Sequence, residues 1–289
     1  MVNTKEIKEK KSIKELLEFG IINIDKPSGP TSFDVSDFVR KTLGLRKTSH
    51  FGTLDPKVTG VLPIAMNRAC KLTGFFLGED KEYVGIMRIH EPVSDEELEK
   101  IIKNFTGKIK QIPPVRSRVK RQEREREVKN FEILEKDGQD ILFRAEVQGG
   151  TYIRKLIHDL GIALGVGAHM LELRRIRAGI FMEEKSVDLY ELEKAVNEYK
   201  KDNGDSLKNL ILPGEVVSQI FPVVQVNEES APRILRGQPI YEKDLINDVD
   251  MEKGIRISVF SSDRFIGVFR IVNEDKIFAK SEFVLQPLS

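Results

Sequence analysis

One aspartate stands in a setting that suits a catalytic carboxylate. Asp55 lies in the stretch HFGTLDPKVTGVLP, directly before Pro56 and between Gly52 and Gly60. The proline biases Asp55 away from helical dihedral angles, and the glycines allow tight turns and a close approach of another segment. Such a loop can hold a carboxylate outward at a cleft. An aspartate before a proline can also simply cap a turn, so these residues alone leave both roles open.

A nucleophilic carboxylate must be ionised and oriented, and an arginine partner supplies both. A bidentate ion pair lowers the pKa of a carboxyl group and fixes its direction. Arg154, in GGTYIRKL, is the candidate because it stands where a turn runs into a predicted helix. An enzyme that acts on a nucleobase also needs an aromatic ring for stacking, and Tyr83 and Tyr152 are the candidates. The alternatives are a surface arginine and two core tyrosines.

The other reactive side chains favour chemistry without a metal or a cofactor. Cys70 is the only cysteine, which excludes an intramolecular disulfide and fits a cytoplasmic location. No P-loop is present. Zinc-ligand spacing is absent from the four histidines, at positions 50, 90, 158 and 169. His50, five residues before Asp55, is a candidate either for substrate contact or for capping.

Two basic clusters indicate where RNA phosphates could bind. The total charge is uninformative, since 47 basic and 46 acidic residues leave a net charge of +1. In the segment PPVRSRVKRQEREREVKN, the first half is free of acids, and its candidate phosphate contacts are Arg116, Arg118, Lys120 and Arg121. The second cluster contains Arg174, Arg175 and Arg177. Each cluster could equally be a solvated charged face.

The length of the chain and a change in its predicted secondary structure indicate two domains. Its 289 residues are 32% charged and 40% hydrophobic, which is an ordinary globular composition. Helix and strand patterns mix up to about residue 217, and short strands with turns follow. We therefore expect an α+β catalytic domain over residues 1–217 and a β-rich module over 218–289. No apolar run is long enough for a membrane span.

Periodicity and turn residues predict the elements around Asp55. GIINID and EYVGIMRIH read as strands, and Asp137–Gly138 predicts a hairpin. HMLELRRIRAGIF reads as mixed helix and strand. Helices are expected over residues 33–43, over 64–76 after the Asp55 loop, over 94–105, after GGTY, and over 188–201.

Five motifs in this order resemble the TruB family of pseudouridine synthases: INIDKPSGPTS, HFGTLDPKVTGVLP, KEYV, GTYIRKLIHDLG and HMLELRRIRAG. They span residues of about 20–182. LDPKVTGVLP followed by KLTGF, and PPVRSRVKR in the place of a basic thumb loop, are similar to the archaeal and eukaryotic dyskerin-like branch. FPVVQVNEESAPRILRGQPIY is similar to the opening of a PUA domain. The resemblance implies a catalytic domain with a mixed, largely antiparallel sheet and a cleft, plus a small β-barrel PUA domain on which residues 1–19 pack.

The resemblance also implies catalytic roles for three residues. Asp55 aligns with the family's nucleophile, and Arg154 aligns with the arginine that pairs with it. Tyr83 aligns with the tyrosine that packs on the target base and takes part in proton removal from C5.

Further residues would bind substrate or RNA by the same resemblance. Leu173 would line the base pocket, and Lys26 lies in the KPSGPTS loop beneath the site. His50 would contact substrate, and Arg236 would contact RNA in the PUA domain. Tyr152 is a further candidate for substrate contact because its ring could stack on a base, apart from the resemblance. Phe51 stands where a small residue is expected, and it could narrow the entry of the loop.

The activity implied by the resemblance is cofactor-free isomerisation of uridines in rRNA or tRNA to pseudouridine, directed by an H/ACA guide RNA. The implied partners are the guide RNA, the substrate RNA, small Nop-type and Gar-type proteins, and a kink-turn-binding ribosomal-like protein. One alternative is a stand-alone synthase that acts on the T-loop uridine of tRNA. Another is a non-catalytic RNA-binding scaffold, against which the intact Asp55, Tyr83 and Arg154 argue. The last alternative is an unrelated α+β enzyme whose motifs match those of the family by accident.

Overall fold

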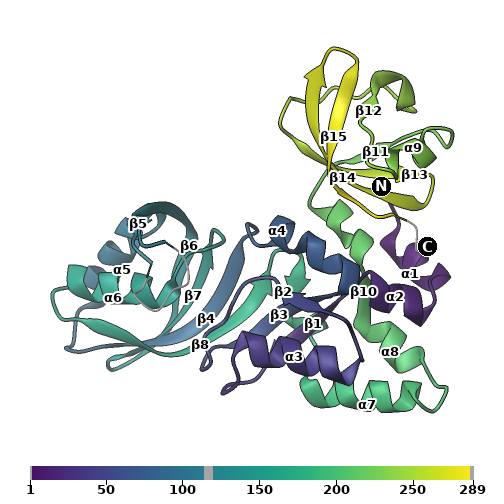
Figure 1. Ribbon diagram of the computed structural model, residues 1–289. Coiled ribbons are helices and arrows are strands. Elements are labelled where there is room, and N and C mark those ends of the chain that lie inside the picture. Colours follow the sequence, from purple (N-terminus) through teal and green to yellow (C-terminus); the bar gives the residue numbers. More distant parts are fainter. Residues whose placement is uncertain (1, 114–119, 287–289) are drawn as a thin grey trace. The chain divides into compact units, whose positions relative to one another are not determined.

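The computed structural model describes residues 2–113 and 120–286, which fall into two compact units (Figure 1). Unit 1 contains the chain up to Ile21, the segment Met66–Leu72 and the chain from Ile211 onward. Unit 2 contains Ile22–Ala65 and Thr73–Leu210. The predicted catalytic residues all belong to unit 2. A domain boundary at residues 217 and 218 stays a prediction.

A mixed sheet forms the framework of unit 2. Its strands lie in the order β1 (Gly20–Lys26), β3 (Thr59–Met66), β8 (Ala168–Ala178), β4 (Lys81–Ile89), β7 (Asp140–Val147), β6 (Arg124–Asp137) and β5 (Gly107–Gln111). The short strands β2 (Thr48–His50) and β9 (Phe181–Met182) pair with β3 and β8. β3 and β8 are parallel, whereas β4, β7, β6 and β5 form antiparallel ladders. The predicted α+β class with a mixed, largely antiparallel sheet is confirmed.

Strand β4 shows how the sequence fixes which side chains face the core. Its odd-numbered residues from Lys81 to Ile89 are buried and the even-numbered ones are more exposed, as the two-residue period of a strand requires. Gly85 lies in the middle, opposite Leu173 of β8. A Cβ atom at Gly85 would come within 2.8 Å of the Leu173 side chain and of the Phe143 ring, so the close packing here needs glycine.

The helices of unit 2 are α3 (Ser32–Thr42), α4 (Thr73–Phe76), α5 (Asp95–Asn104), α6 (Ile153–Ala163), α7 (Leu189–Tyr199) and α8 (Asp205–Leu210), with the 3-10 turn η2 (Glu183–Lys185). Capping boxes begin α3 at Thr31 and α7 at Asp188. Helix α6 follows a Gly–Gly turn and packs against β8. The helices predicted at 33–43, 94–105, after GGTY and at 188–201 are confirmed to within a few residues.

Two predictions of local structure are wrong. Residues 64–76 do not form one helix, because the chain continues β3 to Met66 and then makes a 3-10 turn, η1 (Asn67–Leu72), and the short α4. The run TGVLPIAM is buried along nearly its whole length, and a continuous apolar run does not distinguish a helix from a buried strand by period. Residues 168–178 are strand throughout, without the predicted helical part.

Unit 1 contains a curled five-stranded sheet, ordered β11 (Val223–Gln225), β13 (Arg256–Ser261), β14 (Arg264–Glu274), β15 (Ile277–Val284) and β12 (Ile240–Tyr241). Unit 1 also contains the following elements outside this sheet: α1 (Thr4–Lys10), α2 (Ile13–Glu18), β10 (Ile211–Pro213), η3 (Gly214–Gln219), α9 (Ala231–Ile234) and η4 (Glu242–Asp244). The Phe19 ring stacks on Phe265 at 5.8 Å between centroids, and Lys10 pairs with Asp263. The predicted β-rich C-terminal module is confirmed.

Candidate active site

Asp55 and Arg154 form an ion pair on the surface of unit 2. Asp55 lies in the loop between β2 and β3, and Arg154 is the second residue of α6. Arg154 Nη2 is 2.8 Å from Asp55 Oδ2, and the two side chains are 56% and 47% exposed. An ion pair this exposed contributes at most about 1 kcal/mol to folding stability. Its consequence is therefore orientation: an accessible carboxylate is directed by a guanidinium that stands 99 positions later in the chain.

Two buried side chains hold the backbone on either side of Asp55. Ser32 Oγ donates to the Leu54 carbonyl oxygen at 2.9 Å and accepts from the Leu54 amide at 2.8 Å. Lys26 Nζ donates to the carbonyl oxygens of Pro56 and Val58, both at 2.9 Å. The carboxylate is exposed, but the loop that carries it is fixed from within the domain.

Lys26 supports the loop from the end of β1. Its side chain is fully buried, and a third bond reaches the Pro27 carbonyl oxygen at 2.8 Å. Burial lowers the pKa of Lys26, and the negative charge of Asp55 partly opposes that shift. The three ammonium protons have three backbone acceptors, so a bond to substrate would require Lys26 to release one of them. Its predicted role in substrate binding stays a prediction.

Arg175 is interior, which contradicts the prediction that it contacts RNA. The residue is 1% exposed. Its Nε donates to the Val61 carbonyl oxygen at 2.7 Å, and its Nη2 donates to the Gly52 carbonyl oxygen at 3.0 Å. The alternation of β8 directs Leu173 and Arg175 inward, and a basic cluster read as one surface overlooks that alternation. Arg175 thus ties β8 to β3 and to the start of the Asp55 loop.

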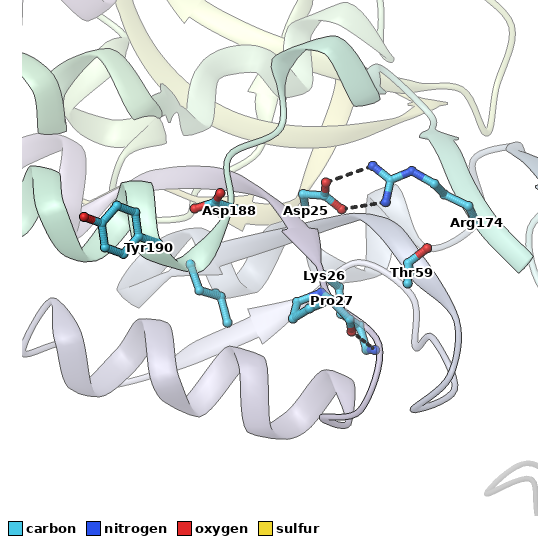
Figure 2. A pocket seen from close by; sticks show the side chains of 8 residues that line it. Asp25, Lys26, Pro27, Thr59, Arg174, Asp188 and Tyr190 are labelled. Atoms are coloured by element: carbon cyan, nitrogen blue, oxygen red, sulfur yellow. Dashed lines mark hydrogen bonds and ion pairs between the residues drawn. The ribbon is translucent and has the colours of Figure 1, made fainter.

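Arg174 points to the opposite face of β8, where carboxylates surround it (Figure 2). Its Nη1 and Nη2 atoms are 3.0 and 2.8 Å from the two Asp25 carboxylate oxygens, and Glu183 is a further partner. The pair borders a pocket of about 340 Å³ that Tyr190 and Asp188 also line. Contact of Arg174 with RNA stays a prediction, and its charge is already balanced by these two carboxylates.

The N-terminal half of the basic segment lies largely outside the described residues. This applies to Arg116 and Arg118. Lys120 and Arg121 are described and exposed, and Arg121 Nε donates to the Pro113 carbonyl oxygen at 3.4 Å. Arg236 is exposed after α9 in unit 1. Contact of these residues with RNA stays a prediction.

No sequence motif points to Gln111, which fixes the start of α6. Its side-chain Oε1 accepts from the Tyr152 amide at 3.0 Å, and its Nε2 donates to the Tyr152 carbonyl oxygen at 3.2 Å. Tyr152 occupies the N-cap position of α6, so its backbone is anchored two residues before Arg154. Only the pairing of β5 with β6 brings Gln111 to this place, and no local motif announces it.

Three further predicted site residues lie on strands: Tyr83 on β4, Leu173 on β8 and His50 on β2. Tyr83 is 8% exposed and lies opposite Arg175, and Leu173 is 7% exposed. His50 Nε2 is 3.1 Å from Thr53 Oγ1. Burial first and the charge of Arg175 second lower the pKa of His50, which favours a neutral imidazole at pH 7. Substrate contacts of Tyr83, Leu173, His50 and Tyr152 stay predictions.

Phe51 belongs to the core of unit 2. It is 1% exposed, and its ring stacks on Phe76 at 4.7 Å between centroids and lies 5.7 Å from Phe181. The expectation that Phe51 narrows the loop entry is wrong, because its ring is enclosed among other rings.

In residues 2–113 and 120–286, no group of three or more histidine, cysteine, aspartate or glutamate side chains could hold a metal ion. Over the same ranges, no helix is long and apolar enough to cross a membrane.

Comparison with known proteins decides the family. Residues 40–94 and 88–153 match the TruB family pseudouridylate synthase N-terminal domain, and residues 154–218 match the tRNA pseudouridylate synthase B C-terminal domain. A probable tRNA pseudouridine synthase B of Methanopyrus kandleri is 45% identical over 249 residues, which are 86% of this chain and 73% of that protein. The protein belongs to the TruB family of pseudouridine synthases. It is an RNA pseudouridine synthase, as its five motifs predicted.

The N-terminal residues and the solved structures indicate the branch of the TruB family. Residues 8–36 match the DKCLD domain. A chain in the crystal structure of a Cbf5-Nop10-Gar1 complex is 37% identical, with a TM-score of 0.90 over 97% of this chain and 89% of that chain. A chain in the structure of an H/ACA RNP bound to a substrate RNA containing 2'-deoxyuridine is 35% identical, with a TM-score of 0.88 and the same coverage. This TruB-family synthase is therefore of the archaeal dyskerin-like type.

Proposed function

We propose that this synthase converts specific uridines of rRNA or tRNA to pseudouridine under the direction of an H/ACA guide RNA, with Asp55 as the nucleophile. The observation that carries the assignment of Asp55 is its 2.8 Å ion pair with Arg154 in an accessible loop. Guide direction rests on similarity over 97% of the chain to proteins solved in a Cbf5-Nop10-Gar1 complex and in an H/ACA RNP with substrate RNA.

The reaction breaks the N1–C1′ bond of uridine and forms a C5–C1′ bond. Uracil stays in the site between the two steps, N1 gains a proton and C5 loses one. A carboxylate nucleophile divides this change into two easier steps, and the ion pair with Arg154 directs the Asp55 carboxylate. Tyr83 packs on the base and takes part in removal of the C5 proton, and Leu173 lines the pocket beside it.

The target uridine must leave its stack before it can react. Unstacking and unpairing a base cost a few kcal/mol. Electrostatic contacts to the RNA backbone can offset that cost, and Lys120 and Arg121 are the exposed residues that we assign to them. The proposed partners are the guide RNA, Nop-type and Gar-type proteins and a kink-turn-binding ribosomal-like protein. A cytoplasmic location is part of the same proposal.

A stand-alone tRNA synthase is the second candidate function. The observation in its favour is that relatives from Methanopyrus kandleri and Methanocaldococcus jannaschii, 45% and 43% identical, are named as probable tRNA pseudouridine synthases B. The two functions share the same active site and differ in what brings the uridine to it.

Tritium release from RNA that carries 5-tritiated uridine tests the proposal, because the C5 hydrogen is lost only when C5 joins C1′. The purified chain is assayed alone on tRNA and then with guide RNA and partner proteins on a matching target. We expect release in the guided assay and none from Asp55→Asn, whose amide cannot act as the nucleophile. Release from tRNA by the chain alone would favour the stand-alone function. Full activity of Asp55→Asn would exclude Asp55 as the nucleophile.

A further inference from the structure

The residue directly before Asp55 is held more tightly than Asp55 itself. Leu54 is 3% exposed, and both of its backbone polar groups bond to one hydroxyl, Ser32 Oγ, at 2.8 and 2.9 Å. Ser32 is 1% exposed. Because one buried hydroxyl both donates and accepts, it fixes the Leu54 peptide groups in position and in orientation. The Cα of Asp55 is attached to the second of these peptide groups, so its position is restricted as well.

Helix α3 gives Ser32 a fixed location. Ser32 is its first residue, and the helix begins with a capping box in which the Thr31 amide and hydroxyl donate to Asp34 Oδ2 at 2.9 and 2.7 Å. Val35 and Val39, on the buried side of α3, are 1% and 0% exposed. The first turn of α3 is therefore rigid, and it presents the hydroxyl to the loop.

The ion pair with Arg154 does not perform this anchoring. That pair joins two half-exposed side chains, so it directs the carboxylate but does not hold the backbone of the loop. Lys26 and Arg175 hold the loop at Pro56 and Gly52, on either side of Asp55. On the N-terminal side of Asp55, the nearest anchored residue is Leu54, and Ser32 is the residue that anchors it.

We propose that Ser32 is a positioning residue for the reaction: its two bonds to Leu54 set the place from which Asp55 attacks. This inference rests on the proposed role of Asp55 as the nucleophile. A nucleophile displaced by about 1 Å loses on the order of 100-fold in rate. Loss of the hydroxyl should therefore lower the rate of the chemical step while the RNA surface and substrate affinity stay unchanged.

Helix α3 supplies a matched control for Ser32→Ala. Ser36 lies one turn later and is 5% exposed, and its hydroxyl donates to Thr48 Oγ1 at 2.9 Å and not to the Asp55 loop. Ser32→Ala and Ser36→Ala each delete one buried hydroxyl from the same helix. A purely structural role would affect both variants in the same way.

The experiment measures kcat and KM for tritium release by the full chain with guide RNA and partner proteins, and the melting temperature of each variant. We expect kcat of Ser32→Ala to fall 10- to 100-fold with KM within twofold, whereas Ser36→Ala keeps kcat within twofold at a similar loss of melting temperature. Ser32→Cys replaces the hydroxyl with a larger thiol that bonds weakly, and its kcat should fall at least fivefold even if the alanine variant does not fold.

The outcomes separate this inference from the proposed function. If the wild-type chain is active, Asp55→Asn is inactive, and Ser32→Ala and Ser32→Cys keep kcat within twofold, the positioning role of Ser32 is refuted and Asp55 keeps its role. If the wild-type chain releases no tritium in either assay, the proposed function fails and this inference fails with it. Equal losses of kcat in Ser32→Ala and Ser36→Ala would reduce Ser32 to a general contributor to stability.

Discussion

At the scale of single residues, three cations of unit 2 lie in its interior, whereas Asp55 is about half exposed. Lys26, Lys81 and Arg175 are 0%, 4% and 1% exposed, and each donates to backbone carbonyl oxygens. Burial lowers the pKa of Lys81 to about 8, and the charge of Arg175 adds to that effect. These side chains are structural donors that bond to the backbone from within unit 2.

Replacement of Arg154 by lysine tests whether orientation of Asp55 matters beyond charge. Lysine keeps the positive charge but lacks the planar fork that holds a carboxylate in one direction. We expect kcat of Arg154→Lys in the tritium assay to fall about 10- to 100-fold with little change in KM, a loss of roughly 1.4–2.7 kcal/mol in transition-state stabilisation.

The neighbouring Lys155 provides the control for Arg154→Lys. Lys155 pairs with Asp159 along the same helix, so Lys155→Ala changes the charge of α6 without touching Asp55. Its kcat should stay within twofold of the wild type. Wild-type kcat in Arg154→Lys would mean that the fork geometry is dispensable.

At the scale of elements, the parallel contact of β3 with β8 forms the base of the Asp55 loop. Gly60 pairs with Arg175 in this register and has φ of +97°. A Cβ atom there would lie 2.2 Å from the Arg175 carbonyl oxygen, a distance that only a shift of the backbone could relieve. Gly60, after the Asp55 loop, thus permits the strand approach that brings Arg175 to the Gly52 carbonyl.

Gly60→Ala should therefore destabilise the protein by about 2–4 kcal/mol, since it combines a strained φ with a clash against backbone. Gly44→Ala is the matched control, because Gly44 has φ of +63° and open space around the added Cβ. That variant should lose only the roughly 1–2 kcal/mol of the left-handed conformation. Denaturant unfolding of both variants measures the difference, and equal losses would show that the close strand approach is not required.

The elements also show what the sequence could and could not predict. Ser94, followed by Glu97 three residues later, predicted α5, and alternation predicted β4, because such signals act within a few residues. Residues 64–66 at the end of the buried strand β3 fell within a predicted helix, since a continuous apolar run has no period. Asp55 and Arg154 were paired by a resemblance to a family. The inward direction of Arg175 follows from the alternation of β8, which an interpretation of this segment as mixed helix and strand overlooks. The contacts of Ser32 and Gln111 depend on packing between distant segments, which no local pattern encodes.

At the scale of the whole molecule, charge distribution matters more than total charge. The 47 basic and 46 acidic residues nearly cancel, so attraction to RNA must come from local patches. In β5 and β6 the exposed lysines are paired: Lys108 with Glu125 and Lys110 with Glu123, each at 3.0 Å. Lys120 and Arg121 precede this ladder in the acid-free part of the segment. Lys108 and Lys110 therefore carry the same charge as Lys120 and Arg121, but only the first two lie beside glutamates that neutralise them.

This difference predicts how affinity for substrate RNA depends on salt. Each phosphate contact contributes about 0.7–0.9 to the slope of log K against log salt. We expect Lys120→Gln with Arg121→Gln to weaken RNA binding and to reduce the slope by about 1.4–1.8, while the melting temperature stays within about one degree, because both side chains are exposed. Lys108→Gln with Lys110→Gln removes the same charge from residues already paired with glutamates, and its slope should stay close to that of the wild type. Titration of labelled substrate RNA at several salt concentrations distinguishes the two double variants.

Equal changes in slope would show that RNA responds only to the total charge of this region, and no specific phosphate contact could then be assigned to Lys120 and Arg121.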